Sequence, residues 1–395
     1  MKLLQAKLAQ YQEPQKAKAL GIYPYFREIE SEQDTEVYMH GKKVLMFGSN
    51  CYTGLVNDKR VHEAAIKAIQ KYGTGCAGSP FLNGTLDIHK KLERRLADFV
   101  GKEDAMVYST GFGVNLGVVS TLTGRGDYII CDKQDHASII EGRRLSFSNY
   151  LKYKHNDMAS LEEQLKKCEP DRVKLIVTDG VFSMEGDVCN LPEICDLARK
   201  YKAAVMVDEA HSIGVFGEGG RGVCNHFGLS DEVDLIMGTF SKSFASLGGF
   251  IACDETITNF LRHHSRSYIF TASITPASTA AVDAALDIML NEPERQEQLW
   301  KVTHYALDGF RAMGCEIGNT STPIIPLYIR DQNKTFAITA ELLNEGIFVN
   351  PVVSPAVAPQ DTLIRYSLMA THTKEQVDFS LEKIQKVFRK YGVIK

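Results

Sequence analysis

One stretch decides the fold of this chain, and it reads Gly238-Thr239-Phe240-Ser241-Lys242-Ser243-Phe244-Ala245-Ser246-Leu247-Gly248-Gly249. Apolar runs at 233–237 and 250–252 flank it and predict two buried strands. A lysine between buried strands is costly unless its amine is used. Condensation of that amine with an aldehyde is one such use. A loop lysine that points to solvent is the competing interpretation, and the rest of the chain has to decide between them.

The overall composition is that of a globular enzyme. The chain has 395 residues, with 44% hydrophobic and 24% charged residues and a net charge of −4. This charge offers no basic field for nucleic acid, and no apolar run approaches the roughly 20 residues that cross a bilayer. The charged residues near the N-terminus argue against a signal peptide. Nine scattered cysteines without a C-x-x-C pair argue against a zinc site and a disulfide framework. We therefore expect a reduced, cytoplasmic protein.

Residues 104–253 alternate short apolar runs with segments of helical periodicity. This alternation predicts an α/β domain with a mostly parallel sheet that helices cover on both faces. Ligands of such sheets bind beyond the carboxyl ends of the strands. The predicted strands are 105–108, 128–131, 173–177, 203–207 and 233–237, and the predicted helices are 113–122, 137–147, 158–167 and 191–201. Helical periodicity before this region also predicts a helix at 59–72.

The flanking segments predict an N-terminal arm and a smaller C-terminal domain. The arm combines one amphipathic helix over residues 1 to about 20 with a hairpin between 33 and 47. Two long helices, 276–290 and 295–313, lead to an α+β region with further strands and helices. We expect three parts: the arm at 1–48, a large α/β domain at 49–290, and a small α+β domain at 291–395.

The residues that follow the predicted strands carry the chemistry. Gly111 and Phe112 lie at a strand-to-helix turn, where backbone N–H groups and the helix dipole favour an anion. His136 lies at the start of the next helix. Asp208 ends a strand predicted to be central, with His211 three residues further on. A buried carboxylate needs a cationic partner, and a protonated pyridine nitrogen is one candidate.

A metal site formed by Asp208, His211 and His136 is the competing functional interpretation, although no third ligand lies at close spacing. With Lys242, the strand ends offer an anion cradle, an aromatic base, a carboxylate and an amine. Pyridoxal phosphate (PLP) has the matching groups, namely a phosphate, a phenolic oxygen, a ring nitrogen and an aldehyde.

The spacing Asp208-x-x-His211 followed by Thr239-x-x-Lys242 resembles fold-type I PLP enzymes, and most of all the α-oxoamine synthases. The resemblance covers residues 20 to 390. Ser241 stands where most members have glycine, which favours the bacterial members that use serine. The same members are similar in three further stretches, at 72–79, 81–85 and 350–357.

The resemblance implies roles around the cofactor ring. It assigns Lys242 to the cofactor aldehyde and to proton removal from the substrate, and Asp208 to the ring nitrogen. It assigns His211 to the phenolic oxygen, with Ser183 nearby, and His136 to the ring face and the substrate carboxylate.

The same resemblance implies a phosphate site that two subunits share. Gly111, Phe112, Thr239 and Ser241 are the expected phosphate ligands. Thr271 matches a hydroxyl that the neighbouring subunit supplies in this family, so we expect a homodimer with shared active sites.

Substrate contacts are assigned to Asn50 and Arg365, together with His136. The implied reaction is a decarboxylating condensation of L-serine with a long-chain acyl-CoA, with transient contact at a membrane surface as a further expectation. The alternatives are a 2-amino-3-ketobutyrate ligase or another α-oxoamine synthase, an aminotransferase or decarboxylase on the same fold, and a non-catalytic partner subunit.

Overall fold

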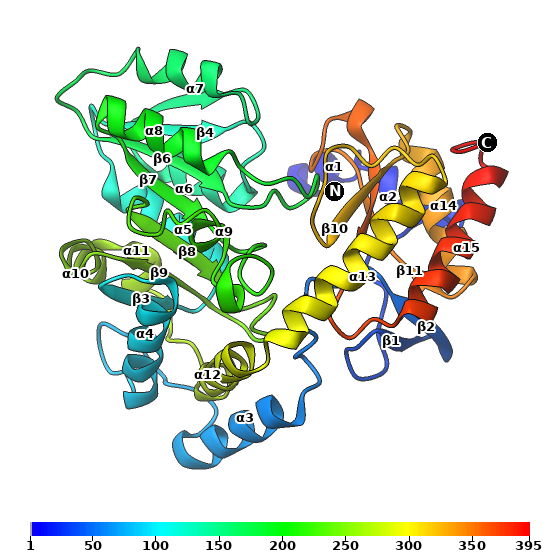
Figure 1. The fold of residues 1–395 in the computed structure, drawn as a ribbon, viewed down its shortest axis with the longest axis horizontal. Helices are drawn as coiled ribbons and strands as arrows, with labels where there is room; N and C mark the ends of the chain where they lie inside the picture. Colours follow the sequence, from blue (N-terminus) through cyan, green and yellow to red (C-terminus); the bar gives the residue numbers. More distant parts are fainter. Residues whose placement is uncertain (1) are drawn as a thin grey trace. The chain divides into compact units, whose positions relative to one another are not determined.

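The computed structural model describes residues 2–395, which form two compact units (Figure 1). One unit is continuous, from Asn50 to Trp300. The other combines the chain up to Ser49 with Lys301–Lys395. Each unit is described separately below.

The continuous unit is built on a seven-stranded sheet with the order β3-β9-β8-β7-β6-β4-β5. Neighbouring strands from β8 to β5 are parallel, and β9 runs antiparallel to both of its neighbours. This confirms the mostly parallel sheet, with β7 in the middle as expected. Its strands are β3 (Asp104–Tyr108), β4 (Tyr128–Asp132), β5 (Asn149–Tyr153), β6 (Lys174–Asp179), β7 (Ala204–Asp208), β8 (Leu235–Thr239) and β9 (Gly249–Cys253).

Helices connect the strands and pack against the sheet, as the α/β class requires (Figure 1). Six of the predicted helices of this unit occur within three residues of their expected bounds. They are α3 (Lys59–Tyr72), α5 (Gly111–Leu122), α6 (Ala137–Leu145), α7 (Met158–Leu165), α8 (Leu191–Tyr201) and α12 (Pro276–Asn291). The unit also contains α4 (Asp87–Val100), η1 (Glu218–Gly220), α9 (Val223–His226), α10 (Glu255–His264) and α11 (Arg266–Ile269).

Side-chain caps fix where several helices begin. Thr110 accepts a hydrogen bond from the backbone N–H of Gly113, and Asp157 accepts one from Ser160. Such caps satisfy N–H groups that have no partner inside the helix. Because Thr110 caps α5 directly after β3, the N-terminus of α5 stands at the carboxyl end of the sheet.

The apolar core of this unit lies between the sheet and its helices. Met106, Ile129 and Val177 contribute from strands, while Val114 and Val118 contribute from α5. All five side chains are buried. Burial on both faces explains why the central strands read as continuous apolar runs. The edge strand β5 is only partly buried and carries Asn149 and Lys152, and its polar sequence gave no strand signal.

The second unit contains two three-stranded sheets, with orders β1-β2-β11 and β10-β13-β12. The hairpin of β1 and β2 is antiparallel, as predicted. The elements are α1 (Leu3–Leu8), α2 (Glu13–Ala19), β1 (Glu36–Met39), β2 (Lys42–Met46), β10 (Ile324–Tyr328), α14 (Gln332–Asn344), β11 (Ile347–Phe348), β12 (Asn350–Val352), η2 (Pro359–Asp361), β13 (Leu363–Ser367) and α15 (Lys374–Lys390). The long helix α13 (Pro293–Ala312) runs from the continuous unit into this one.

The prediction of one helix over residues 1 to about 20 is wrong. The described chain has two short helices there, α1 and α2, and Pro14 lies in the first turn of the second. Proline has no N–H to donate and its ring collides with the preceding turn of a helix. A helix can therefore begin at Pro14 but cannot continue through it.

Within residues 2–395, no helix combines the length and the apolar character that a membrane crossing demands.

A buried carboxylate fastens the turn that follows β7. Glu209 is fully buried, and it accepts hydrogen bonds from the Ser212 hydroxyl and from the backbone N–H groups of Val223 and Cys224, the latter two at 2.8 and 2.7 Å. Burial raises the pKa of Glu209. The carboxylate thus ties the start of α9 to the chain beside Asp208.

Glu209→Ala should lower the free energy of unfolding by about 2–3 kcal/mol, because buried N–H groups lose their acceptor. Chemical denaturation followed by circular dichroism measures the change. Glu63→Ala, at an exposed position of α3, is the control and should leave the midpoint unchanged. Equal denaturation midpoints for Glu209→Ala and Glu63→Ala would show that the hydrogen bonds of Glu209 do not stabilise the fold.

Candidate active site

The carboxyl ends of the central strands meet at a cavity of about 280 Å³. Three of these strands, β6, β7 and β8, end in residues that line the cavity, namely Asp179, Asp208 and Thr239. Eight of the predicted site residues line it together: Gly111, Phe112, His136, Asp208, His211, Thr239, Ser241 and Lys242. The structure therefore brings into one place residues that are up to 131 positions apart in the chain (242 − 111).

Asp208 is held rigidly at the floor of the cavity. Its side chain is 2% exposed. The Asn115 side-chain amide donates to its Oδ2 at 2.7 Å, and the backbone N–H of Ala210 donates to its Oδ1 at 2.9 Å. Both oxygens are thus fixed in direction.

Sequence reasoning missed Asn115. It lies in α5, is fully buried, and also donates to the Ser138 hydroxyl at 2.8 Å. A signal existed, because Asn115 lies among the apolar residues Val114, Leu116 and Val118 of the same helix, and buried polar groups need partners.

His136 is the N-cap residue of α6, as its predicted position at a helix start implied. Its ring Nδ1 lies 2.7 Å from the Ser138 hydroxyl, and its backbone N–H donates to Asp179 Oδ2 at 2.7 Å. Burial lowers the pKa of His136, and Lys242 adds to this effect while Asp208 opposes it. The imidazole is therefore held mainly neutral near pH 7, with its ring against the cavity.

The start of α5 offers an anion cradle. Gly111 approaches β8 so closely that a Cβ atom there would lie 2.5 Å from Thr239 Oγ1. The hydroxyls of Thr239 and Ser241 are 3.1 Å apart and line the same cavity. Backbone N–H groups at a helix N-terminus together with two hydroxyls suit a phosphate group.

Lys242 lies in a loop that is anchored on both sides. The backbone N–H of Ala245 donates to Lys242 O at 2.9 Å, and Ser246 N donates to Phe240 O at 2.8 Å. The neighbouring Ser243 donates its hydroxyl to Ile213 O at 2.6 Å. Lys242 is partly buried and lines the cavity, which favours a use for its amine there over a solvent-facing loop lysine.

Four predicted site residues do not line this cavity. Ser183 is partly buried in the turn after β6, and Thr271 is exposed after α11. Asn50 is partly buried, with its side chain 3.4 Å from the Tyr52 hydroxyl. Arg365 belongs to β13 of the other unit, is 4% exposed, and donates to the Ser367 hydroxyl at 2.6 Å. Their roles stay predictions.

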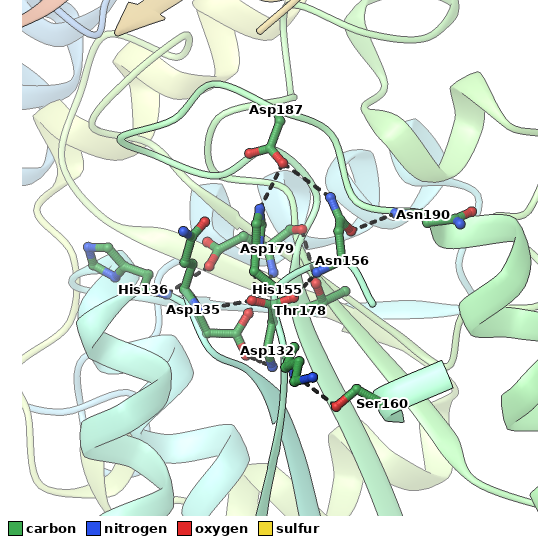
Figure 2. Close-up of polar contacts among 12 residues, drawn as sticks. Asp132, Asp135, His136, His155, Asn156, Ser160, Thr178, Asp179, Asp187 and Asn190 are labelled. Atoms are coloured by element: carbon green, nitrogen blue, oxygen red, sulfur yellow. Dashed lines mark hydrogen bonds and ion pairs between the residues drawn. The ribbon is translucent and has the colours of Figure 1, made fainter. Parts of the chain in front are cut away.

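An acidic network stands behind His136, and Figure 2 shows its connections. Asp179 Oδ2 accepts from His136, and Asp135 Oδ1 accepts from the backbone N–H of Asp179 at 3.3 Å. Burial and the negative charge of Asp208 raise the pKa of Asp179 well above its ordinary value. Burial and the negative charge of Asp179 also raise the pKa of Asp135 well above its ordinary value. The sequence did not identify Asp135 and Asp179 as site residues, because acidic residues that follow a predicted strand are common in turns.

A histidine bridges two further acids at the edge of this network (Figure 2). His155 Nδ1 lies 2.9 Å from Asp132 Oδ1, and His155 Nε2 lies 2.8 Å from Asp187 Oδ2. Burial disfavours the charged ring, but the hydrogen bonds to Asp132 and Asp187 outweigh it and raise the pKa of His155 to about 10. A charged His155 thus joins the end of β4 to the segments after β5 and β6.

Comparison with known proteins identifies the family. The family described as aminotransferase class I and II matches residues 42–384. The serine palmitoyltransferase of Bacteroides thetaiotaomicron is 66% identical over 389 residues, covering 98% of this chain and 99% of that protein. The 8-amino-7-oxononanoate synthase of Petrotoga mobilis is 43% identical over 385 residues, covering 97% and 98%.

The solved structures agree with this result. A serine palmitoyltransferase from S. paucimobilis, with a bound PLP–myriocin aldimine, superimposes with a TM-score of 0.97 at 35% identity, covering 100% of both chains. The chain therefore belongs to the aminotransferase class I and II family, and within it to the serine palmitoyltransferases of the α-oxoamine synthase group. The resemblance and the fold-type I architecture predicted from sequence are confirmed.

Because the pKa of His155 is about 10 in the folded chain and about 6.5 when unfolded, its ion pairs contribute fully below pH 6.5 and are lost as the pH rises through 10. We expect His155→Gln to cost about 3 kcal/mol of unfolding free energy at pH 6. The difference from wild type should shrink towards pH 10.

Urea denaturation at a series of pH values measures this difference. His62→Gln, which removes an exposed histidine, serves as the control and should show no such trend. A deficit of His155→Gln that stays constant from pH 6 to pH 10 would contradict a charged bridge.

Proposed function

We propose that this chain catalyses the PLP-dependent, decarboxylating condensation of L-serine with a long-chain acyl-CoA, palmitoyl-CoA in particular. The products are 3-ketosphinganine, coenzyme A and carbon dioxide, which makes this the first step of sphingolipid synthesis. The observation that carries the proposal is the single cavity that Lys242, Asp208, His136 and the start of α5 line together. The chain is thus an acyltransferase of the α-oxoamine synthase type.

The side chains present fit PLP. The fixed carboxylate of Asp208 suits a protonated ring nitrogen, and the amine of Lys242 suits an aldehyde. Gly111, Phe112, Thr239 and Ser241 would hold the phosphate. When bound, the cofactor supplies an electron-accepting ring that stabilises negative charge on the substrate's α-carbon.

Further contacts complete the proposed site. His136 would cover the ring face, and His211, with Ser183 nearby, would bond the phenolic oxygen. Thr271 would reach the phosphate of the neighbouring subunit, so the active form would be a homodimer with shared sites.

Lys242 and its surroundings would carry the proton transfers. Nζ of Lys242 accepts the proton from the α-carbon of serine, after which that carbon bonds to the acyl carbon and the C–S bond to coenzyme A breaks. After carbon dioxide leaves, the ammonium of Lys242 returns a proton to the same carbon. His136, Asn50 and Arg365 would orient the serine and its carboxylate, which fixes the bond that is broken.

The long acyl chain of the proposed donor also suggests where in the cell the enzyme acts. We infer a cytoplasmic homodimer that contacts a membrane surface transiently to collect its long-chain acyl-CoA. The net charge of −4 supports the absence of a nucleic-acid partner.

Lys242→Ala should abolish turnover, with a loss of at least about 1,000-fold, because both the aldehyde-binding amine and the base are removed. The visible absorbance of protein reconstituted with PLP should also be lost. Absorbance spectra and thiol release measure the two effects. Lys133→Ala, on the exposed loop after β4, should change neither of them. Retention of both signals in Lys242→Ala would refute the assignment.

The substrate assignment predicts thiol release with serine and palmitoyl-CoA at a kcat/KM at least about tenfold above that with glycine and acetyl-CoA. The family also contains relatives named 8-amino-7-oxononanoate synthase, so alanine with pimeloyl-CoA is the second comparison. A dye that reacts with free coenzyme A follows all three reactions. A preference for either alternative pair would keep the enzyme class but overturn the substrate.

A further inference from the structure

Tyr52 is a buried tyrosine that touches a proposed cofactor ligand. Its side chain is fully buried, and its hydroxyl lies 2.7 Å from Nδ1 of His211. The two ring centroids are 6.0 Å apart, with 60° between the ring planes. Tyr52 lies 159 positions before His211, and no sequence pattern marked it.

A turn of the backbone holds Tyr52 in place. Its N–H donates to Asn50 O at 2.9 Å, and the N–H of Gly54 donates to Cys51 O at 2.9 Å. The adjacent Thr53 donates its hydroxyl to Ser243 O at 2.5 Å, next to Lys242. The segment 50–54 is therefore fastened to the loop that carries the lysine.

The Tyr52 hydroxyl has two hydrogen-bond partners at different distances. Tyr52 can donate to His211 Nδ1 at 2.7 Å or to Asn50 Oδ1 at 3.4 Å. A buried hydroxyl needs an acceptor, and a bond of 2.7 Å is near the optimum while 3.4 Å is at the limit. The contact with His211 is therefore the stronger of the two, and a hydroxyl hydrogen that points along it makes Nδ1 of His211 the acceptor.

The tautomer of His211 follows from this direction. A neutral imidazole carries its hydrogen on one nitrogen only, and the partner of the other nitrogen selects which one. With Nδ1 as acceptor, the hydrogen of His211 is on Nε2. His211 lines the cavity, so its donor nitrogen can then serve an acceptor oxygen there.

We propose that Tyr52 is a positioning residue that holds His211 in the Nε2–H tautomer, so that His211 donates a hydrogen bond to the phenolic oxygen of the bound cofactor. This inference rests on the proposed function and deepens it. Without Tyr52, both tautomers and other ring orientations become accessible, and the donor is present only part of the time.

Other titratable groups line the cavity and influence the titration that Tyr52 is expected to shift. They are Asp208, Asp179, His136 and Lys242. A substitution that leaves these groups in place and removes only the Tyr52 hydroxyl therefore isolates the effect.

The test is a pH titration of the visible absorption band of the PLP-loaded enzyme, without substrate. A hydrogen bond to the phenolic oxygen favours its deprotonated form. Tyr52→Phe should therefore raise the midpoint of the titration by about half a pH unit or more. Tyr108→Phe is the matched control, since this buried tyrosine loses a hydroxyl that donates to Ser265 at 3.0 Å and does not line the cavity.

The outcomes separate the inference from the proposed function. A wild-type enzyme that shows no absorption band with PLP overturns both. A wild-type enzyme with the band, but with the same midpoint in Tyr52→Phe as in Tyr108→Phe, overturns the role of Tyr52 alone. A midpoint that is raised in Tyr52→Phe and not in Tyr108→Phe supports it.

A second variant keeps the test decisive if Tyr52→Phe does not fold. Incorporation of 3-fluorotyrosine at position 52 retains the ring and the hydroxyl but makes the hydroxyl a stronger donor. The midpoint should then fall below that of the wild type, because His211 Nε2–H becomes the stronger donor in turn. An unchanged midpoint in this variant would also overturn the inference.

Discussion

The fixed carboxylate of Asp208 is the constraint on which the site depends. It ends the middle strand of a seven-stranded sheet, and Asn115 and the N–H of Ala210 each hold one of its oxygens. A buried charge of this kind is costly unless a cation faces it. The cavity, the cradle at α5 and the loop of Lys242 all lie around this charge. The sheet therefore creates a site that a cationic ring can complete.

Hydrogen-bonded support extends beyond the residues that line the cavity. Asn115 joins Asp208 to Ser138, and Ser138 lies against the ring of His136. Asp179 holds the backbone of His136, and the bridge at His155 ties neighbouring loops together. Residues that orient reacting groups in this way restrict their motion, and catalysis depends on such restriction.

Much of the fold could be predicted from the sequence because the central strands are buried on both faces. Continuous apolar runs marked β4, β6, β7 and β8 for this reason. The polar edge strand β5 gave no such signal. The expected single N-terminal helix is wrong because proline cannot lie in the interior of a helix, and Pro14 therefore lies in the first turn of a second one. Helix α4 also went unassigned, although it carries an amphipathic pattern of buried residues.

The sequence by itself determined the fold class, the family and the eight predicted residues that line the cavity. The alternation of strands and helices and the placement of polar residues at strand ends are local patterns, and the family follows from the resemblance of the motifs around Asp208 and Lys242. Only the tertiary structure decided the supporting contacts. Asn115 meets Asp208 across 93 positions, and Tyr52 meets His211 across 159. Such pairs depend on how strands and helices pack, and hydrogen-bond distances between remote side chains have no local signature. The sequence of the loop at 238–249 was therefore enough to single out Lys242, whereas the residues that surround this lysine could be identified only in the folded structure.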